Sequence, residues 1–288
     1  MRILITGAAG MLGRAVVAAC ADQDAVGVDL PDGDLTRPDD VDALLRVHRP
    51  AWVIHCAAYT DVDGAETARD IAWRANAEAT ALLADRCGAL EIGLSAVSTD
   101  YVFAGDAADG YHEDAPRAPL SHYGATKAAA ELAVEAMGGR GQIVRTSWLF
   151  GPGPKNFVRT IRRLLRERDE LRVVEDQRGC PTYAPDLARV LAYLAMDGTP
   201  GRYHATNAGV CTWFEFAREI AAREGHDPAK VRPCTSAEYP TPARRPACSV
   251  LHSRALEARG CPPRPDWRDA LDRYLELLRR EDAAEEER

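Results

Sequence analysis

The chain has 288 residues, 46% hydrophobic and 28% charged, so it is long enough to bury a large core in one or two domains. A formal net charge of -8 argues against a surface built mainly for nucleic acid or anionic membranes. Neither an apolar stretch of about 18 residues nor a secretory signal is present, so we expect a cytoplasmic protein.

Up to about residue 150, short runs rich in Val and Ile alternate with Ala-rich segments of helical period. The runs predict strands at 2–6, 25–29, 52–58, 92–99 and 142–150, and the intervening segments predict helices at 13–20, 38–47, 71–87 and 123–137. Strands and helices that alternate in this way form a parallel sheet covered by helices. The predicted fold class is α/β, with a doubly wound parallel sheet in residues 1–150.

Prolines break the chain into shorter pieces after residue 150. Helices are predicted at 157–167, 186–196, 213–224 and 267–280, and strands at 171–174 and 202–205. We expect residues 151–280 to form mainly a smaller α+β lobe that binds the substrate, with some segments free to return to the sheet. Residues 281–288 are nearly all charged or Ala, which predicts a frayed tail.

A G-x-x-G-x-x-G turn follows the first strand and opens a helix. In a dinucleotide site of the Rossmann type, such glycines permit a sharp turn, let backbone N–H groups approach a pyrophosphate, and let the helix pack on the strand. A tight turn without a ligand is the alternative. Because Asp29 ends the second strand, where an acidic residue contacts ribose, the cofactor interpretation is favoured. The candidate residues of the turn are Gly7, Gly10, Met11, Leu12 and Gly13.

The residues after the second strand bear on the choice between NADH and NADPH. Asp29 can accept hydrogen bonds from the adenosine ribose and would repel a 2′-phosphate, which favours NADH. Arg37 in the following loop could pair with that phosphate, which leaves NADPH open. Asp34 and Leu35 fall where side chains can reach the adenine, although a simple polar loop explains them equally well.

Tyr123 and Lys127 are four residues apart at the start of a predicted helix, so both project from one face. A neighbouring ammonium would lower the pKa of a phenol, which is otherwise about 10, and would make it useful for proton transfer. An exposed helix pair is the alternative. Thr99 ends the fourth strand at the carboxyl edge, where ligands bind in open parallel sheets, so its hydroxyl is a candidate to share a substrate oxygen.

Taken together, the glycine turn, the strand end and the Y-x-x-x-K pair resemble an extended short-chain dehydrogenase/reductase, and more closely the dTDP-4-dehydrorhamnose reductase family. The likeness covers nearly the whole chain. It rests on S-T-D-Y-V-F at 98–103, Y-G-A-T-K at 123–127, R-T-S-W at 145–148, N-F at 156–157, D-Q-R-G-C-P-T at 176–182, Y-H at 203–204 and T-P-A-R-R-P at 241–246.

The resemblance implies roles for individual residues. Thr99, Tyr123 and Lys127 would be catalytic, with Tyr123 and Lys127 also holding the cofactor. Further candidates are Ala57, Ala58 and Tyr59 at the cofactor, and Tyr101, Trp148, Asn156, Arg244 and Arg245 at the substrate. A negatively charged chain that binds a dianionic diphosphate needs a local cationic clamp, which supports the two arginines. A solvated charge pair is the alternative for that loop.

The implied activity is NAD(P)H-dependent reduction of the C4 keto group of a nucleotide-activated, dTDP-linked 4-keto-6-deoxyhexose. Cys56, Tyr59, Ala130 and Cys248 depart from the family pattern, so a rhamnose pathway and an antibiotic deoxysugar pathway both stay open. Two alternatives are an epimerase or dehydratase of the same superfamily and a non-catalytic regulatory subunit. A dehydratase would need Glu after Asp100, and the complete catalytic trio weighs against the regulatory subunit.

The sequence also bears on which molecules the protein binds and on whether it assembles with itself. We expect a nucleotide-sugar substrate, no nucleic acid and no membrane, and a homodimer is the assembly left open. The 8 cysteines include no C-x-x-C pair and the 7 histidines lack metal-ligand spacing, so no disulfide framework and no metal site are predicted.

Overall fold

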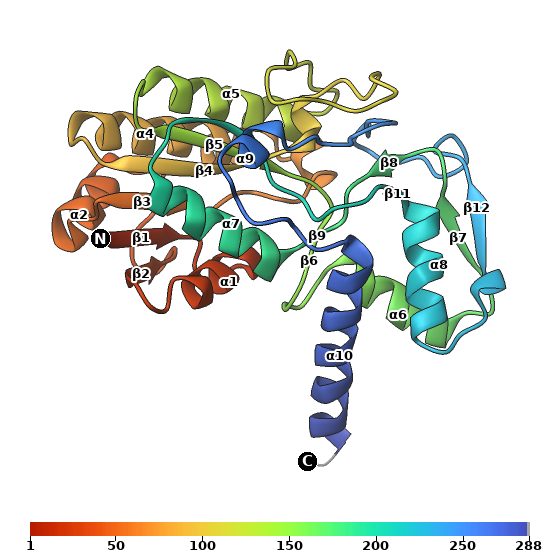
Figure 1. Ribbon diagram of the computed structural model, residues 1–288. Helices are drawn as coiled ribbons and strands as arrows, with labels where there is room; N and C mark the ends of the chain where they lie inside the picture. Colours follow the sequence, from red (N-terminus) through yellow and green to blue (C-terminus); the bar gives the residue numbers. More distant parts are fainter. Residues whose placement is uncertain (287–288) are drawn as a thin grey trace.

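The computed structural model describes residues 1–286 and contains a six-stranded parallel sheet in the order β10-β5-β4-β3-β1-β2 (Figure 1). The strands are β1 (Arg2–Thr6), β2 (Asp24–Val28), β3 (Trp52–His55), β4 (Gly93–Thr99), β5 (Gly141–Thr146) and β10 (Gly201–His204). The strand order reverses beside β1, which makes the sheet doubly wound and confirms the predicted fold class.

Helices cover both faces of this sheet (Figure 1). One face carries α1 (Met11–Ala19) and α7 (Ala184–Asp197), and the other carries α2 (Pro38–His48), α4 (Ala79–Ala89) and α5 (His122–Ala136). Alternate residues of β1 explain the two layers, because Ile3 and Ile5 lie in the core beneath α1 and α7, whereas Leu4 lies in the core on the opposite face.

The second lobe has a separate apolar core that contains Phe150, Phe216 and Trp267. Its helices are α6 (Phe157–Glu167), α8 (Trp213–Arg223) and α10 (Trp267–Glu286). Its short strands pair as β6 (Leu149–Phe150) with β9 (Thr182–Tyr183), β7 (Leu171–Val174) with β12 (Val231–Cys234), and β8 (Arg178–Gly179) with β11 (Cys211–Thr212). The bounds of α6 and β7 agree with the predicted ones.

Shorter elements complete the described chain. A five-residue helix, α3 (Arg69–Trp73), and a π-helical turn (Arg74–Glu78) run without a break into α4, so the helix predicted at 71–87 is confirmed, with a π-helical turn that the sequence did not indicate. The helix α9 (Arg254–Ala258) lies beside β10. Single 3-10 turns occupy Gly64–Glu66, Asp100–Val102 and Pro228–Lys230.

Two predicted strands end earlier than expected. The strand predicted at 52–58 stops at His55, because β1, its partner, turns away at Gly7 with a positive φ of 69°. The strand predicted at 142–150 stops at Thr146, and Trp148 with φ 49° redirects the chain into β6. This break carries the chain from the sheet to the second lobe.

The segment from α7 to β10 belongs to the sheet and not to the second lobe, a return that the prediction leaves open for part of residues 151–280. β10 pairs in parallel with β5, and Leu187, Leu191 and Tyr203 share the core beneath α1. The apolar pattern of α7 and β10 is compatible with burial in either lobe, so the sequence alone does not predict which lobe contains them.

The frayed tail predicted at 281–288 is wrong for residues 281–286, which continue α10. Arg159 pairs with Glu281 and Arg162 pairs with Asp282, so the start of that segment is tied to α6. Residues 287–288 lie outside the described part. Within residues 1–286, we find no helix whose length and hydropathy would let it span a membrane.

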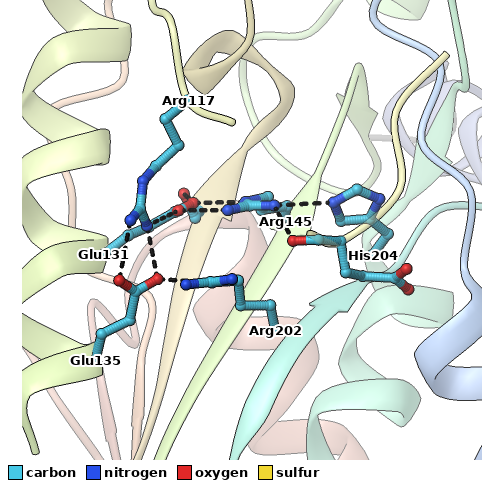
Figure 2. A network of polar contacts seen from close by, with 8 residues as sticks. Arg117, Glu131, Glu135, Arg145, Arg202 and His204 are labelled. Carbon is cyan, nitrogen blue, oxygen red and sulfur yellow. Dashed lines mark hydrogen bonds and ion pairs between the residues drawn. The ribbon is translucent and has the colours of Figure 1, made fainter. Parts of the chain in front are cut away.

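A buried network of ion pairs ties α5 to the strands beside it (Figure 2). The side chains of Glu131 on α5 and Arg145 on β5 are each 1% exposed and form two bonds, Nε to Oε1 at 2.8 Å and Nη2 to Oε2 at 2.7 Å. Ser98 of β4 donates to Glu131 at 2.5 Å, and Arg117 donates to both Glu131 and Glu135. Because buried charge is costly unless paired, the network fixes α5 against the ends of β4 and β5.

Arg145→Met tests this network, because it leaves Glu131 buried without its main partner. We expect the free energy of unfolding to fall by about 3–5 kcal/mol. Arg163→Met is the control, since Arg163 and Glu167 form a pair with side chains 60% and 50% exposed, and its loss should cost less than about 0.5 kcal/mol. Urea unfolding followed by circular dichroism measures both; similar losses in the two variants would contradict the prediction.

Candidate active site

A cleft of about 770 Å³ lies at the carboxyl edge of the sheet. It is lined by the glycine turn, the ends of β2, β3 and β4, the start of α5, and the turn that leads into the second lobe. The predicted site residues that line it are Gly7, Gly10, Met11, Leu12, Gly13, Asp29, Asp34, Leu35, Ala57, Ala58, Tyr59, Thr99, Tyr101, Tyr123, Lys127 and Trp148. The fold thus brings together residues that are far apart in the sequence.

The glycine turn has the shape and the free donors that a diphosphate needs. Gly7 has φ 69°, and a Cβ there would lie 2.6 Å from the backbone nitrogen of Ala57. Gly10, the N-cap of α1, has no side chain to cap the helix, so the N–H groups of Met11 and Leu12 have no partner within the helix and lie at the cleft. A helix N-terminus of this kind favours a phosphate group, so these residues fit a dinucleotide cofactor.

The acidic residue after β2 also stabilises the turn itself. The backbone N–H of Ala9 donates to Oδ2 of Asp29 at 2.8 Å. Oδ1 of Asp29 accepts from the N–H of Leu30 at 2.9 Å. The carboxylate therefore already holds the glycine turn against the end of β2, in addition to any contact with a ribose.

The far end of the cleft carries one more carboxylate and a nearby arginine. Thr36 donates to Asp34 from its backbone at 2.9 Å and from its hydroxyl at 2.8 Å, and these bonds hold the pKa of Asp34 below its usual value. The side chain of Arg37 is 67% exposed and lies 3.9 Å from Asp40. Arg37 does not line the cleft, but its exposed side chain directly follows Thr36, which does.

The cleft also contains the hydroxyl of Thr99, which already forms two hydrogen bonds with neighbouring residues of the chain. Thr99 ends β4, accepts from the N–H of Tyr101 at 3.2 Å and donates to Oδ1 of Asp100 at 2.9 Å. Burial raises the pKa of Asp100 to about 6. Tyr101 meets Tyr123 edge to face, with ring centroids 5.8 Å apart. Thr99 therefore has to turn away from Asp100 before it can donate to a ligand.

Tyr123 and Lys127 lie on the buried face of α5, whose start is capped by Ser121. Burial raises the pKa of Tyr123, the charge of Asp100 adds to the rise, and the Thr99 hydroxyl opposes it. Burial also lowers the pKa of Lys127 to about 8, against the effect of Glu131. The expectation that Lys127 lowers the pKa of Tyr123 is therefore wrong for the protein without ligands, because desolvation dominates. Tyr123 stays a neutral phenol at neutral pH and can donate a proton.

Three candidate substrate residues are not among those that line the cleft. Asn156 caps α6, and its side-chain amide donates to the Gly151 carbonyl at 2.9 Å and to the Tyr274 hydroxyl at 2.8 Å. Arg245 forms two bonds with Asp63, at 3.1 and 2.8 Å, while Arg244 is exposed. Of the two arginines of this loop, Arg244 is the more exposed, while Arg245 is held by Asp63.

Sequence reasoning missed two residues. Asn76, buried in the π-helical turn, accepts from the Tyr59 N–H at 2.8 Å and donates to the Tyr59 carbonyl at 3.0 Å and to the Thr126 hydroxyl at 2.9 Å, so it holds the loop after β3 against α5. Lys155 lines the cleft from the loop before α6. Lys155 could have been found from the sequence, because a basic residue there directly precedes the candidate Asn156. No sequence pattern points to Asn76.

Comparison with known proteins identifies the family. Residues 1–280 match the model of the family described as RmlD substrate binding domain. The chain belongs to this family. It is 46% identical to a probable dTDP-4,6-dihydroxy-2-methyloxan-3-one 4-ketoreductase of Streptomyces antibioticus, over 94% of this chain and 93% of that relative. It is 44% identical to a dTDP-4-dehydrorhamnose reductase of Streptomyces griseus, over 96% of this chain and 94% of that relative.

Solved structures agree with this membership of the RmlD family. The crystal structure of a dTDP-4-dehydrorhamnose reductase from Bacillus anthracis in complex with NADP superposes with a TM-score of 0.91. The two chains are 38% identical, and the match covers 95% of this chain and 98% of that one. The resemblance inferred from the motifs is confirmed.

The low pKa of Lys127 can be measured directly, because the lysines of the chain are Lys127, Lys155 and Lys230. In protein with 13C-labelled lysine side chains, we expect one resonance to titrate near about 8. Above its pKa, Lys127 is neutral. Lys127→Met assigns the resonance by removing it. Titration of that resonance above about 10 would contradict the burial argument.

Proposed function

We propose that this protein reduces the C4 keto group of a dTDP-linked 4-keto-6-deoxyhexose with NAD(P)H. The observation that carries the proposal is the convergence of Thr99, Tyr123 and Lys127 in the same cleft that the glycine turn lines. The similar proteins from Streptomyces carry the names of a 4-ketoreductase and a dTDP-4-dehydrorhamnose reductase. Since nucleotide sugars and NAD(P)H are both cytoplasmic metabolites, the cytoplasm is the proposed place of action.

In this proposal, the glycine turn and the first N–H groups of α1 bind the cofactor diphosphate, and Asp29 faces the adenosine ribose. When bound, the nicotinamide supplies a hydride to the sugar carbonyl. Asp29 disfavours a 2′-phosphate, whereas Arg37 is accessible to pair with one. The related structure from Bacillus anthracis holds NADP, so both cofactors are retained in the proposal.

Tyr123 is the proposed general acid, which gives its proton to the developing C4 alkoxide. Its raised pKa suits this direction of transfer, because the phenol is fully protonated at neutral pH. Thr99 donates a second hydrogen bond to the same oxygen once its hydroxyl turns from Asp100. Lys127, charged below a pKa of about 8, stabilises negative charge that forms on Tyr123 and holds the ribose hydroxyls.

The substrate residues come from both lobes. Trp148 and Tyr101 line the cleft beside Tyr123 and are proposed to enclose the sugar. Arg244 is proposed to bind the nucleotide diphosphate, while Arg245 supports the loop through Asp63 and Asn156 supports the start of α6. Cys56 and Tyr59, which depart from the family pattern, also line the cleft and leave the configuration of the sugar open.

The direct test is consumption of NADH or NADPH with dTDP-4-keto-6-deoxyhexoses, with the product identified by NMR. We expect cofactor oxidation only when the ketosugar is present. Tight retention of the cofactor without net oxidation would instead indicate an epimerase or dehydratase. Absence of turnover and of cofactor binding would indicate the regulatory-subunit alternative.

Tyr123→Phe removes the proposed proton donor and keeps the ring. We expect kcat to fall by about 10²–10⁴-fold, with little change in cofactor affinity. Tyr193→Phe is the control, since the hydroxyl of Tyr193 bonds to the Arg259 carbonyl outside the cleft. A Tyr123→Phe enzyme with normal kcat would remove this tyrosine from the mechanism.

Arg244→Ala should weaken binding of the nucleotide sugar alone. A charge-assisted contact contributes about 1.5–3 kcal/mol, so the KM for the sugar should rise about ten- to a hundredfold while the KM for NADPH stays unchanged. Arg245→Ala should also raise the sugar KM, because it leaves Asp63 unpaired beside the same loop. Arg163→Ala, in an exposed pair on α6, is the control. Unchanged sugar KM in both variants would show that the loop does not bind the diphosphate.

A further inference from the structure

Trp148 has a backbone conformation that a bulky residue adopts only when its surroundings enforce it. Its φ is 49°, in the left-handed region, immediately after Ser147 and before β6. The Trp148 carbonyl accepts from the Thr182 N–H at 3.2 Å, beside the first pair of the β6–β9 ribbon. The half-buried indole lines the cleft. The strained turn therefore places this ring at the cleft wall, and its position depends on what holds it there.

The first support is a stacked indole that does not line the cleft. The rings of Trp148 and Trp213 are nearly parallel, at 8°, with centroids 3.6 Å apart. Trp213 is the first residue of α8, between Thr212 and Glu215 of the capping box, and it also packs on Phe157 with centroids 4.5 Å apart. The indole of Trp213 is thus fixed by the second lobe and offers a rigid surface to Trp148.

The second support is the absence of a side chain at Gly179. A Cβ at this position would lie 2.5 Å from Cε2 and 2.6 Å from Nε1 of Trp148, closer than nonbonded atoms can approach. Gly179 does not have a positive φ, so its backbone does not require glycine. Its strand β8 pairs with β11, where Gly179 lies opposite Cys211, just before the helix that carries Trp213. The pair of strands β8 and β11 therefore both leaves room for the Trp148 indole, at Gly179, and positions its stacking partner, Trp213.

We propose that Trp213 and Gly179 are positioning residues that fix the Trp148 indole at the cleft wall and thereby set the affinity for the nucleotide sugar without touching it. The inference rests on the proposed function, in which Trp148 encloses the sugar. On this inference, recognition of the sugar depends on the stacked pair of Trp148 and Trp213 and not on the Trp148 ring alone.

A double-mutant cycle tests whether Trp213 acts through Trp148. Trp213→Ala should raise the KM for the dTDP-4-ketosugar about three- to tenfold, the value expected for loss of an aromatic pair, and leave the KM for NADPH within about twofold. In the Trp148→Ala background the same substitution should change the sugar KM by less than about twofold. Trp213→Phe, which keeps an aromatic ring at this position, should retain most of the parent protein's affinity for the ketosugar. An equal rise in both backgrounds would overturn the inference.

Gly179→Ala perturbs Trp148 while every aromatic ring is kept, so it serves if Trp213→Ala does not fold. We expect the same selective rise in the sugar KM. Gly88→Ala is the matched control, because a Cβ on that α4 glycine would meet nothing within 4 Å. Near-UV circular dichroism of the proteins without ligands should change in Gly179→Ala and Trp213→Ala but not in Gly88→Ala. Normal spectra and normal KM values in the first two variants would overturn the inference.

The two proposals fail in distinguishable ways. If the parent protein reduces ketosugars and the cycle shows no coupling between Trp148 and Trp213, only the positioning inference fails. If the parent reduces no ketosugar, the proposed function fails, and the same cycle is then measured on the Kd for dTDP-glucose, a nucleotide sugar that carries a hexose for Trp148 to contact. Coupling in that Kd would support the positioning inference by itself, and its absence would overturn it.

Discussion

The buried pair of Glu131 and Arg145 is the interaction on which the arrangement of the site depends. Both side chains are 1% exposed, so neither charge can leave its partner without a large desolvation cost. Glu131 lies one helical turn after Lys127, and Ser98, which donates to Glu131, directly precedes Thr99. The pair therefore links the helix that carries Tyr123 and Lys127 to β5, and the bond from Ser98 to Glu131 links that helix to the strand that ends in Thr99.

The same buried surroundings set the proton chemistry of the site. Desolvation raises the pKa of Tyr123 and lowers the pKa of Lys127 to about 8. A neutral phenol beside a lysine that is still charged at neutral pH suits protonation of an alkoxide. The negative charge of Glu131 keeps the pKa of Lys127 from falling further. A network that secures the fold thus also maintains the charge on a candidate catalytic residue.

Features that depend on neighbouring residues in the sequence could be predicted from it. Alternation of apolar runs and helical segments gave the doubly wound sheet, and the G-x-x-G-x-x-G spacing predicted a turn that the structure places at the cleft. The positions of β10 and Arg245 could not be predicted. β10 joins a strand far earlier in the chain, and Arg245 pairs with Asp63, 182 residues away. Asn76 was missed because its role comes from bonds to two segments that only the fold brings together.

The energetic balance around Tyr123 was misjudged for a related reason. The spacing of Tyr123 and Lys127 correctly put both residues on one helix face, but it carries no information on how deeply that face is buried. Desolvation, which depends on burial, raises the pKa of Tyr123, and the effect that opposes it comes from the Thr99 hydroxyl and not from Lys127. The position of Trp148 likewise depends on a stacking partner 65 positions later in the sequence.

Transfer of a label from the cofactor tests the central claim most directly. The protein would be incubated with a dTDP-4-keto-6-deoxyhexose and NADPH that carries deuterium at C4 of the nicotinamide, in separate samples for the two faces. Reduction predicts deuterium at C4 of the hexose product from one labelled form only, with equimolar oxidised cofactor released. A converted sugar that carries no deuterium from either form, or no net oxidation of the cofactor, would contradict the account.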